Sequence, residues 1–168
     1  IMPSGMIWLR SERNGCVQIQ DSSLDYEYYS RRNNKLNNNY IAYIHEDKDE
    51  NIWILTGCGL GLIRADESKT TLFFGKNDTI QQAFYSVLEM KDRIWFGSDG
   101  GKIWSYSTTT QQFELFETGV FSSVKHLIYN QKGQIVIGTE NDGILFHNLI
   151  TEKTERYNTG NSELAKNR

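Results

Sequence analysis

A motif that returns every 41 to 45 residues constrains the fold of this 168-residue chain more than any other feature. Its clearest copy is Asn51-Ile-Trp-Ile-Leu-Thr56, which is followed by a glycine-rich turn. Taking Trp8, Trp53, Trp95 and Val136 as equivalent positions gives spacings of 45, 42 and 41 residues. A tryptophan-bearing repeat of about 40 residues is typical of propeller blades or of another repeat array. The chain is therefore predicted to use one small unit several times.

The second repeat shows what each repeat contains. Four short apolar runs, separated by turn residues, cover Ile41–Ile44, Ile52–Leu55, Leu60–Arg64 and Thr70–Phe74. Runs of this length between turn signals predict strands, here an antiparallel meander of four. The second run is apolar at every position, so both faces of the small sheet should be covered. Sheets that stack face to face around an axis have this property.

We therefore predict an all-β fold of β-propeller blades, each a four-stranded antiparallel meander, with about four repeats. The predicted repeats are 1–33 (partial), 34–75, 76–117 and 118–158, with 159–168 as a linker into a further repeat. Residues before Met6 are too few for a first strand, and the polar tail cannot supply one. The segment is expected to be a fragment of a larger propeller, completed by more chain or by a second copy. A self-closed ring of four blades is the weaker alternative.

Composition excludes some partners. Lys and Arg number 18 and Asp and Glu number 21, which gives a net charge of −3 and no basic field for phosphates. Nucleic acid is therefore not expected as a partner. No apolar run approaches the ~20 residues that cross a bilayer, so no membrane contact is expected from this segment. Cys16 and Cys58 lie in no CxxC pattern and are predicted to be free thiols.

The units share a more specific pattern. In the second unit Ile44-His-Glu-Asp47 precedes Asn51-Ile-Trp-Ile54, with Gly59-Leu60 and an aromatic last strand behind them. Ile94-Trp-Phe-Gly-Ser98 and Ile137-Gly-Thr139 return in the third and fourth units. This pattern resembles the two-component-regulator propeller repeat over nearly the whole chain.

The resemblance carries expectations about function. Such repeats are typical of the extracytoplasmic sensor region of Bacteroides-type hybrid two-component sensor histidine kinases. It implies a non-enzymatic segment in the periplasmic part of an inner-membrane receptor. The signal would be a glycan fragment, and the membrane span and the histidine kinase would lie outside these residues.

The sequence contains no strong residue pattern for catalysis or metal binding. Asp47-x-Asp49-x-Asn51 opens like a calcium loop, but Ile52 stands at the glycine position, so a hairpin turn is the better interpretation. The three histidines share no metal-ligand spacing, and no Ser-His-Asp or Cys-His pattern has local support. No catalytic residue, metal or cofactor is therefore predicted.

Propeller geometry indicates where a ligand would bind. The loops between the second and third strands of a blade, and those between consecutive blades, emerge on one face. Asn38 and Asn39 lie there, and Trp104 is a further aromatic side chain that could stack on a sugar. The candidate ligand-binding residues are Arg10, Arg13, Asn14, Tyr40, Thr56, Ser98, Asp99, Phe121, Glu140, Asn141 and Asp142.

Three functions remain open from the sequence. The first is a sensor propeller that changes state when it binds an oligosaccharide. The second is a polysaccharide-processing enzyme on a propeller scaffold, since one fold hosts many functions. The third is a structural or protein-interaction propeller. Open sheet edges would also favour self-association of the chain, or association with the remainder of a parent propeller.

Overall fold

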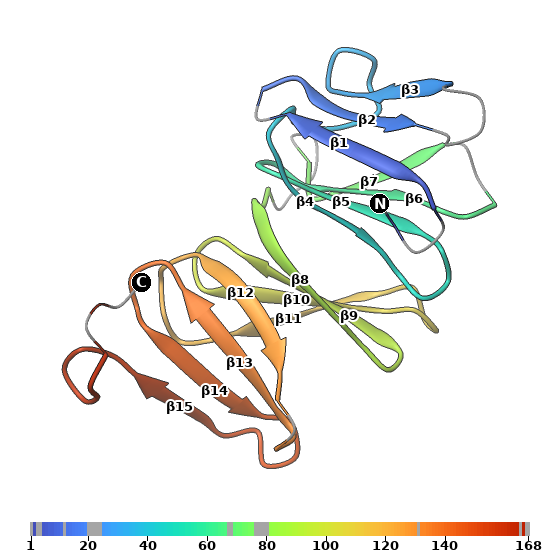
Figure 1. Cartoon of the computed structure of the whole chain (residues 1–168). Coiled ribbons are helices and arrows are strands. Elements are labelled where there is room, and N and C mark those ends of the chain that lie inside the picture. Colours follow the sequence, from blue (N-terminus) through green and yellow to red (C-terminus); the bar gives the residue numbers. More distant parts are fainter. Residues whose placement is uncertain are drawn as a thin grey trace. The chain divides into compact units, whose positions relative to one another are not determined.

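The structure, a computed structural model, describes residues 2, 5–11, 13–19, 25–66, 69–75, 81–130, 132–164 and 166. Every regular element in this described part is a strand, and the strands form four antiparallel sheets (Figure 1). Three sheets have four strands and the first has three. The predicted all-β fold of small meanders is confirmed.

The strands pair in chain order within each sheet. The first sheet comprises β1 (Ile7–Ser11), β2 (Gly15–Ile19) and β3 (Tyr26–Tyr29). The second comprises β4 (Ile41–Glu46), β5 (Ile52–Thr56), β6 (Leu60–Ile63) and β7 (Thr70–Phe73). The third comprises β8 (Phe84–Met90), β9 (Arg93–Ser98), β10 (Lys102–Ser107) and β11 (Phe113–Glu117). The fourth comprises β12 (Val124–Tyr129), β13 (Gln134–Thr139), β14 (Ile144–Asn148) and β15 (Thr154–Tyr157).

The chain divides into two compact units, Ile1–Phe84 and Tyr85–Arg168. Each has its own hydrophobic core between two sheets. In the first unit β1–β3 pack on β4–β6 through a cluster that includes Cys16, Tyr29 and Ile54. In the second, Ile103 of the third sheet packs with Ile137 and other side chains of the fourth. Among the second strands, β5 is buried at every position, as its continuous apolar run predicts, whereas β13 alternates between buried and half-buried side chains.

One glycine begins or precedes the third strand of every repeat for a steric reason. Gly15, Gly59, Gly101 and Gly143 all have φ between 68° and 94°, where glycine is favoured. A Cβ at any of them would lie within 2.4 Å of a main-chain carbonyl oxygen of the last strand or of the segment after it. The backbone crossing therefore requires glycine, which accounts for its recurrence in the motif.

Asp47 holds the hairpin turn between β4 and β5. Its carboxylate accepts hydrogen bonds from the Asp49 N–H at 3.0 Å, from the Asn51 N–H at 2.9 Å, and from the Trp53 indole Nε1–H at 2.9 Å. Asp47 and Trp53 are 5% and 1% exposed. The hairpin interpretation of the Asp47–Asn51 stretch is confirmed, and Trp53 is a core residue.

The two cysteines are free thiols, as predicted. Cys16 is buried, and this burial raises the pKa of its thiol to about 12. Cys58 lies half-buried in the turn between β5 and β6.

Candidate ligand-binding site

Loops from the same end of neighbouring strands are joined by backbone hydrogen bonds in each unit. In the first unit the Gly15 N–H donates to the Asn39 carbonyl at 3.0 Å, and the Gly57 N–H donates to the Tyr40 carbonyl at 3.1 Å. In the second unit the Glu140 N–H donates to the Ser123 carbonyl at 2.9 Å. The turn between the second and third strands therefore lies against the inter-sheet segment, and the candidate residues of each unit gather at one end of its sheets.

The second unit has a hollow at this end. Its volume is about 460 Å³, and its lining consists of Lys125, His126, Thr139, Glu140 and Asn141. Two of these residues come from β12 and three from the end of β13 and the turn behind it. Lys125, His126, Glu140 and Asn141 carry side-chain groups that can donate or accept hydrogen bonds, so the hollow suits a polar ligand.

Lys125 is the fixed charge of this hollow. Its Nζ lies 3.5 Å from Glu140 Oε2 and 3.4 Å from the centroid of the Tyr85 ring. A carboxylate and an aromatic face thus hold the ammonium group from two directions. Both charged side chains stay partly exposed, at 30% for Lys125 and 50% for Glu140.

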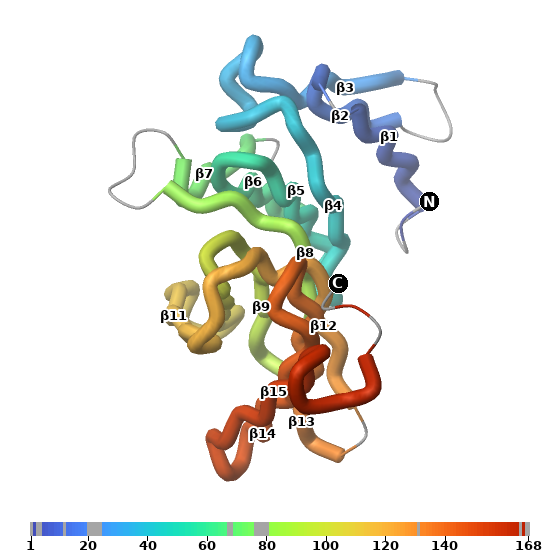
Figure 2. Tube along the Cα trace, turned by 90° about the vertical axis from the view of Figure 1, so that its left-hand side faces the viewer, coloured from blue at the N-terminus to red at the C-terminus, as the bar shows by residue number. Residues whose placement is uncertain are grey.

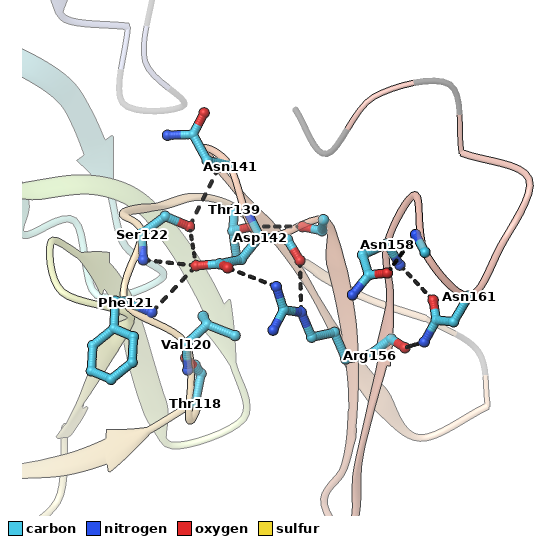
Figure 3. A network of polar contacts seen from close by, with 12 residues as sticks. Thr118, Val120, Phe121, Ser122, Thr139, Asn141, Asp142, Arg156, Asn158 and Asn161 are labelled. Carbon is cyan, nitrogen blue, oxygen red and sulfur yellow. Dashed lines mark hydrogen bonds and ion pairs between the residues drawn. The ribbon is translucent and has the colours of Figure 1, made fainter.

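Asp142 fixes the loop beside the hollow, as Figure 3 shows. Its Oδ2 accepts hydrogen bonds from the Ser122 hydroxyl at 2.7 Å, from the Ser122 N–H at 2.9 Å and from the Phe121 N–H at 3.3 Å. Its Oδ1 lies 2.6 Å from Arg156 Nη2. The hydrogen bonds from Ser122, followed by the Arg156 charge and the Phe121 N–H, hold the pKa of the Asp142 carboxyl below its usual range. Asp142 is therefore a positioning residue, with its oxygens already engaged.

The same network presents Phe121 to solvent. The Asn141 N–H donates to the Ser122 hydroxyl at 3.3 Å, which connects the hollow's turn with the segment after β11. Phe121, which immediately precedes Ser122, is 92% exposed, and its ring points away from the Asp142 carboxylate (Figure 3). An aromatic face that is exposed on a loop held at both ends can stack on an apolar surface of a ligand.

The hydroxyls of two predicted residues are used inside the fold. Thr56 Oγ1 donates to the Gly59 carbonyl at 2.8 Å, and Ser98 Oγ donates to the Lys102 carbonyl at 2.9 Å. Their exposures are 1% and 0%. Thr139 makes the equivalent bond to the Gly143 carbonyl at 2.7 Å. These side chains close the turns, and we leave Thr56 and Ser98 out of the candidate site. Trp104, on β10, was expected to offer a stacking face but is only 7% exposed.

The remaining predicted residues differ in accessibility. Arg10 Nη1 donates to the carbonyls of Ile41 and Ala42, at 2.9 and 2.7 Å, and so ties β1 to β4. Arg13 and Asn14 are exposed in the turn between β1 and β2, and Tyr40 is 45% exposed. Asp99 is half-buried beside Ser98. The structure therefore brings together Glu140, Asn141, Asp142 and Phe121 in the second unit, and a separate exposed group in the first.

Sequence reasoning missed Lys125 and His126. Both lie on β12, where the pattern predicts ordinary strand positions. The pairing of β12 with β13 shifts register between Val124 and His126. Such a bulge changes the direction of the neighbouring side chains. The sequence gives no local signal for it, although the lysine and histidine in an otherwise apolar run are visible.

Two negative findings apply to the described residues. No group of three or more His, Cys, Asp or Glu side chains there could hold a metal ion. In the same part of the chain, no helix is long and apolar enough to span a membrane.

Comparison with protein families identifies one of the repeats. A family profile described as two component regulator propeller matches residues 35–57, which include β4, β5 and the Asp47 turn. The predicted resemblance to that repeat is confirmed there. A comparison with curated protein sequences finds no match.

Solved structures show the same fold. The extracellular domain assigned to the hybrid two-component system BT4673 from B. thetaiotaomicron has a TM-score of 0.79 and 24% identity, over 96% of this chain and 22% of that one. The corresponding domain of BT3049 from the same organism has a TM-score of 0.69 and 18% identity, over 92% and 22%. Virginiamycin B lyase from Staphylococcus aureus also matches, with a TM-score of 0.69 and 19% identity, over 97% and 54%.

These likenesses establish a β-propeller fragment. The chain spans 22% of the length of the first two structures, so it corresponds to a small part of such a domain. It resembles the extracellular propellers of hybrid two-component systems, and lyases share the fold.

Proposed function

We propose that this chain is a ligand-sensing segment of an extracellular sensor propeller, and that it binds an oligosaccharide at the hollow between β12 and β13. The observation that carries the proposal is a polar hollow whose turn is hydrogen-bonded to a segment that carries an exposed aromatic ring. Lys125, Glu140 and Asn141 supply charged and amide groups, and Phe121 supplies an apolar face at 92% exposure. A sugar ring requires both kinds of contact, because its hydroxyls need hydrogen bonds and its C–H face is apolar.

The signal would pass to a histidine kinase outside these residues. A ligand can shift a two-state receptor only by binding one state better than the other. The Asp142 network offers such a coupling, since it links the segment after β11 to the turn after β13 and to Arg156 on β15. In this proposal the segment lies in the periplasmic part of an inner-membrane receptor, which agrees with the extracellular domains that it resembles.

Calorimetric titration of the chain with oligosaccharides tests the proposal. The probes are cello-, xylo-, arabino- and galacturono-oligosaccharides, titrated separately. We expect one class to bind, and we expect Phe121→Ala and Glu140→Gln each to weaken binding about tenfold, equivalent to ~1.4 kcal/mol. Ile150→Ala is the matched control, because Ile150 is also an exposed apolar side chain, at 87%, but lies in the turn after β14.

The titration also separates the alternative functions. Conversion of a bound sugar into products, detected by mass spectrometry, would make the chain an enzyme and overturn the sensor proposal. Absence of binding by every class would favour a protein-interaction propeller. Equal weakening by Ile150→Ala and Phe121→Ala would show that the ligand binds elsewhere.

A further inference from the structure

Two segments at one end of the first unit are tied together by Asn39. Its main-chain carbonyl accepts a hydrogen bond from the Gly15 N–H at 3.0 Å, and its side-chain oxygen accepts one from the Arg31 N–H at 2.7 Å. Asn39 thereby joins the start of β2 to the segment between β3 and β4. In Figures 1 and 2 this segment lies at the start of β4, and the turn between β4 and β5 lies at the far end of that strand. The unit therefore has two distinct ends.

Charge is divided between these two ends. The segments 10–15 and 30–40, at the Asn39 end, contain five basic residues: Arg10, Arg13, Arg31, Arg32 and Lys35. They contain a single acid, Glu12, which lies outside the described residues. Residues 46–50, at the other end of β4, contain four acids and one lysine. The basic end is thus a local feature of a chain whose net charge is −3.

The four arginines at this end are not neutralised by any acid that the structure describes. Lys35 forms an ion pair with Glu27 on β3, but no ion pair within the described part of the chain includes one of the arginines. All four arginines are exposed. Since like charges without counter-charges repel one another, a bound anion would lower the electrostatic energy of this end.

Arg10 is already held in place for such an anion. Its Nη1 donates to the carbonyls of Ile41 and Ala42, at 2.9 and 2.7 Å, and these two bonds fix the guanidinium group. The described residues engage no other nitrogen of this side chain, so Nε and Nη2 keep their N–H groups for a ligand. A guanidinium group presents its donors in a planar fork that fits two oxygens of one oxyanion, which a lysine ammonium group does not.

Neutral polar groups and one aromatic ring lie among the arginines. Asn14 and Asn34 are exposed, and Tyr40 is 45% exposed. Amides can bond to sugar hydroxyls, and an aromatic ring can stack on the C–H face of a sugar. A single-stranded nucleic acid, by contrast, is held by several aromatic rings on which successive bases stack. The described loops at this end expose only the Tyr40 ring, which favours a saccharide.

We propose that this end of the first unit binds an acidic polysaccharide, whose carboxylate or sulfate groups pair with Arg10, Arg13, Arg31 and Arg32. The inference rests on charge complementarity. It is independent of the proposed sugar site, which lies in the other unit, Tyr85–Arg168. Because several arginines take part, the ligand carries several charges along its chain, and salt weakens its binding.

Titration of the chain with three polymers tests the proposal. Polygalacturonate supplies carboxylates, dextran sulfate supplies sulfates, and dextran supplies neither group. We expect at least one charged polymer to bind, more weakly as salt is added, and dextran not to bind. Combined Arg13→Gln and Arg31→Gln substitutions should weaken binding at least about tenfold, because charge-assisted hydrogen bonds are the strong ones.

The matched control is the pair Lys132→Gln and Lys153→Gln, which removes two exposed positive charges from the second unit. This pair and Phe121→Ala should each leave the affinity for the charged polymer unchanged. Phenylglyoxal modification of the parent chain gives a readout that needs no variant. The bound polymer should slow modification of Arg13 and Arg31, located by mass spectrometry, but not that of Arg156.

Four results would overturn the proposal. The first is that neither charged polymer binds, and the second is an equal loss of affinity in the lysine control, which would show a response to net charge alone. The third is tighter binding of a single-stranded DNA of the same total charge, which would make the partner a nucleic acid. The fourth is loss of binding in Phe121→Ala, which would place the polymer at the hollow between β12 and β13. The two proposals can therefore fail separately, since each depends on different side chains.

Discussion

Removal of the Asp142 carboxylate should destabilise the second unit and loosen the candidate site. Asp142→Ala deletes an acceptor of three hydrogen bonds, from the Ser122 hydroxyl, the Ser122 N–H and the Phe121 N–H. Loss of a side chain that satisfies loop N–H groups in this way costs about 0.5–2 kcal/mol. The partly exposed ion pair with Arg156 adds about 0–1 kcal/mol. We therefore expect a loss of about 2 kcal/mol, measured as a fall of about 1 M in the urea midpoint.

The pH dependence of this loss distinguishes the carboxylate from mere packing. The folded-state pKa of Asp142 lies below its unfolded value, so its stabilisation is complete above the unfolded pKa of about 4. That stabilisation disappears as the pH falls through the folded pKa. The difference in unfolding free energy between the parent chain and Asp142→Ala should shrink in urea titrations carried from pH 7 to pH 2. A difference that stays constant over this range would refute the electrostatic account. Ser122→Ala completes a double-mutant cycle that isolates the pairwise contact.

Three further predictions concern the fold. Asp47→Ala should lower the unfolding free energy by about 3 kcal/mol, since it strands a buried indole N–H as well as two turn N–H groups; an effect below 1 kcal/mol in urea unfolding would contradict this. Gly143→Ala should destabilise the chain much more than Gly100→Ala in thermal unfolding. Both glycines have positive φ, but a Cβ at Gly143 would lie 2.2 Å from a carbonyl oxygen, whereas a Cβ at Gly100 would meet nothing within 4 Å. Cys58 should react with a thiol reagent in the native chain while Cys16 reacts only on unfolding, because Cys16 is buried with its pKa raised to about 12; equal native rates would argue against the buried position.

Strand positions were predictable because turn residues and apolar runs alternate so regularly. The predicted Ile52–Leu55 and Leu60–Arg64 runs correspond to β5 (Ile52–Thr56) and β6 (Leu60–Ile63). The predicted first strand of the second repeat, Ile41–Ile44, extends to Glu46. The strand is longer because Asp47 closes the turn two residues later than the apolar run indicates. Period and turn chemistry are local properties, so one sequence is enough to read them.

Side-chain accessibility was less predictable, because it depends on the neighbouring sheet. Tyr29 and Tyr157 occupy the same repeat position, yet their exposures are 1% and 41%. Tyr29 is buried in a core cluster with side chains of β4–β6. A register shift in the strand pairing affects Lys125 and His126, and the β4–β5 pair has the equivalent shift between Ile41 and Tyr43.

The repeat itself separates structural from functional candidates. Thr56, Ser98 and Thr139 recur at one position, and each hydroxyl donates to the carbonyl that closes its turn. A side chain needed by every blade to close a turn is not free to be specific for one ligand. Phe121, at 92% exposure, closes no turn in this way. In a chain of repeats, ligand specificity is expected from positions that differ among the repeats. Phe121 is such a position, and it therefore defines the candidate site in Tyr85–Arg168 more narrowly than the loop geometry that all repeats share.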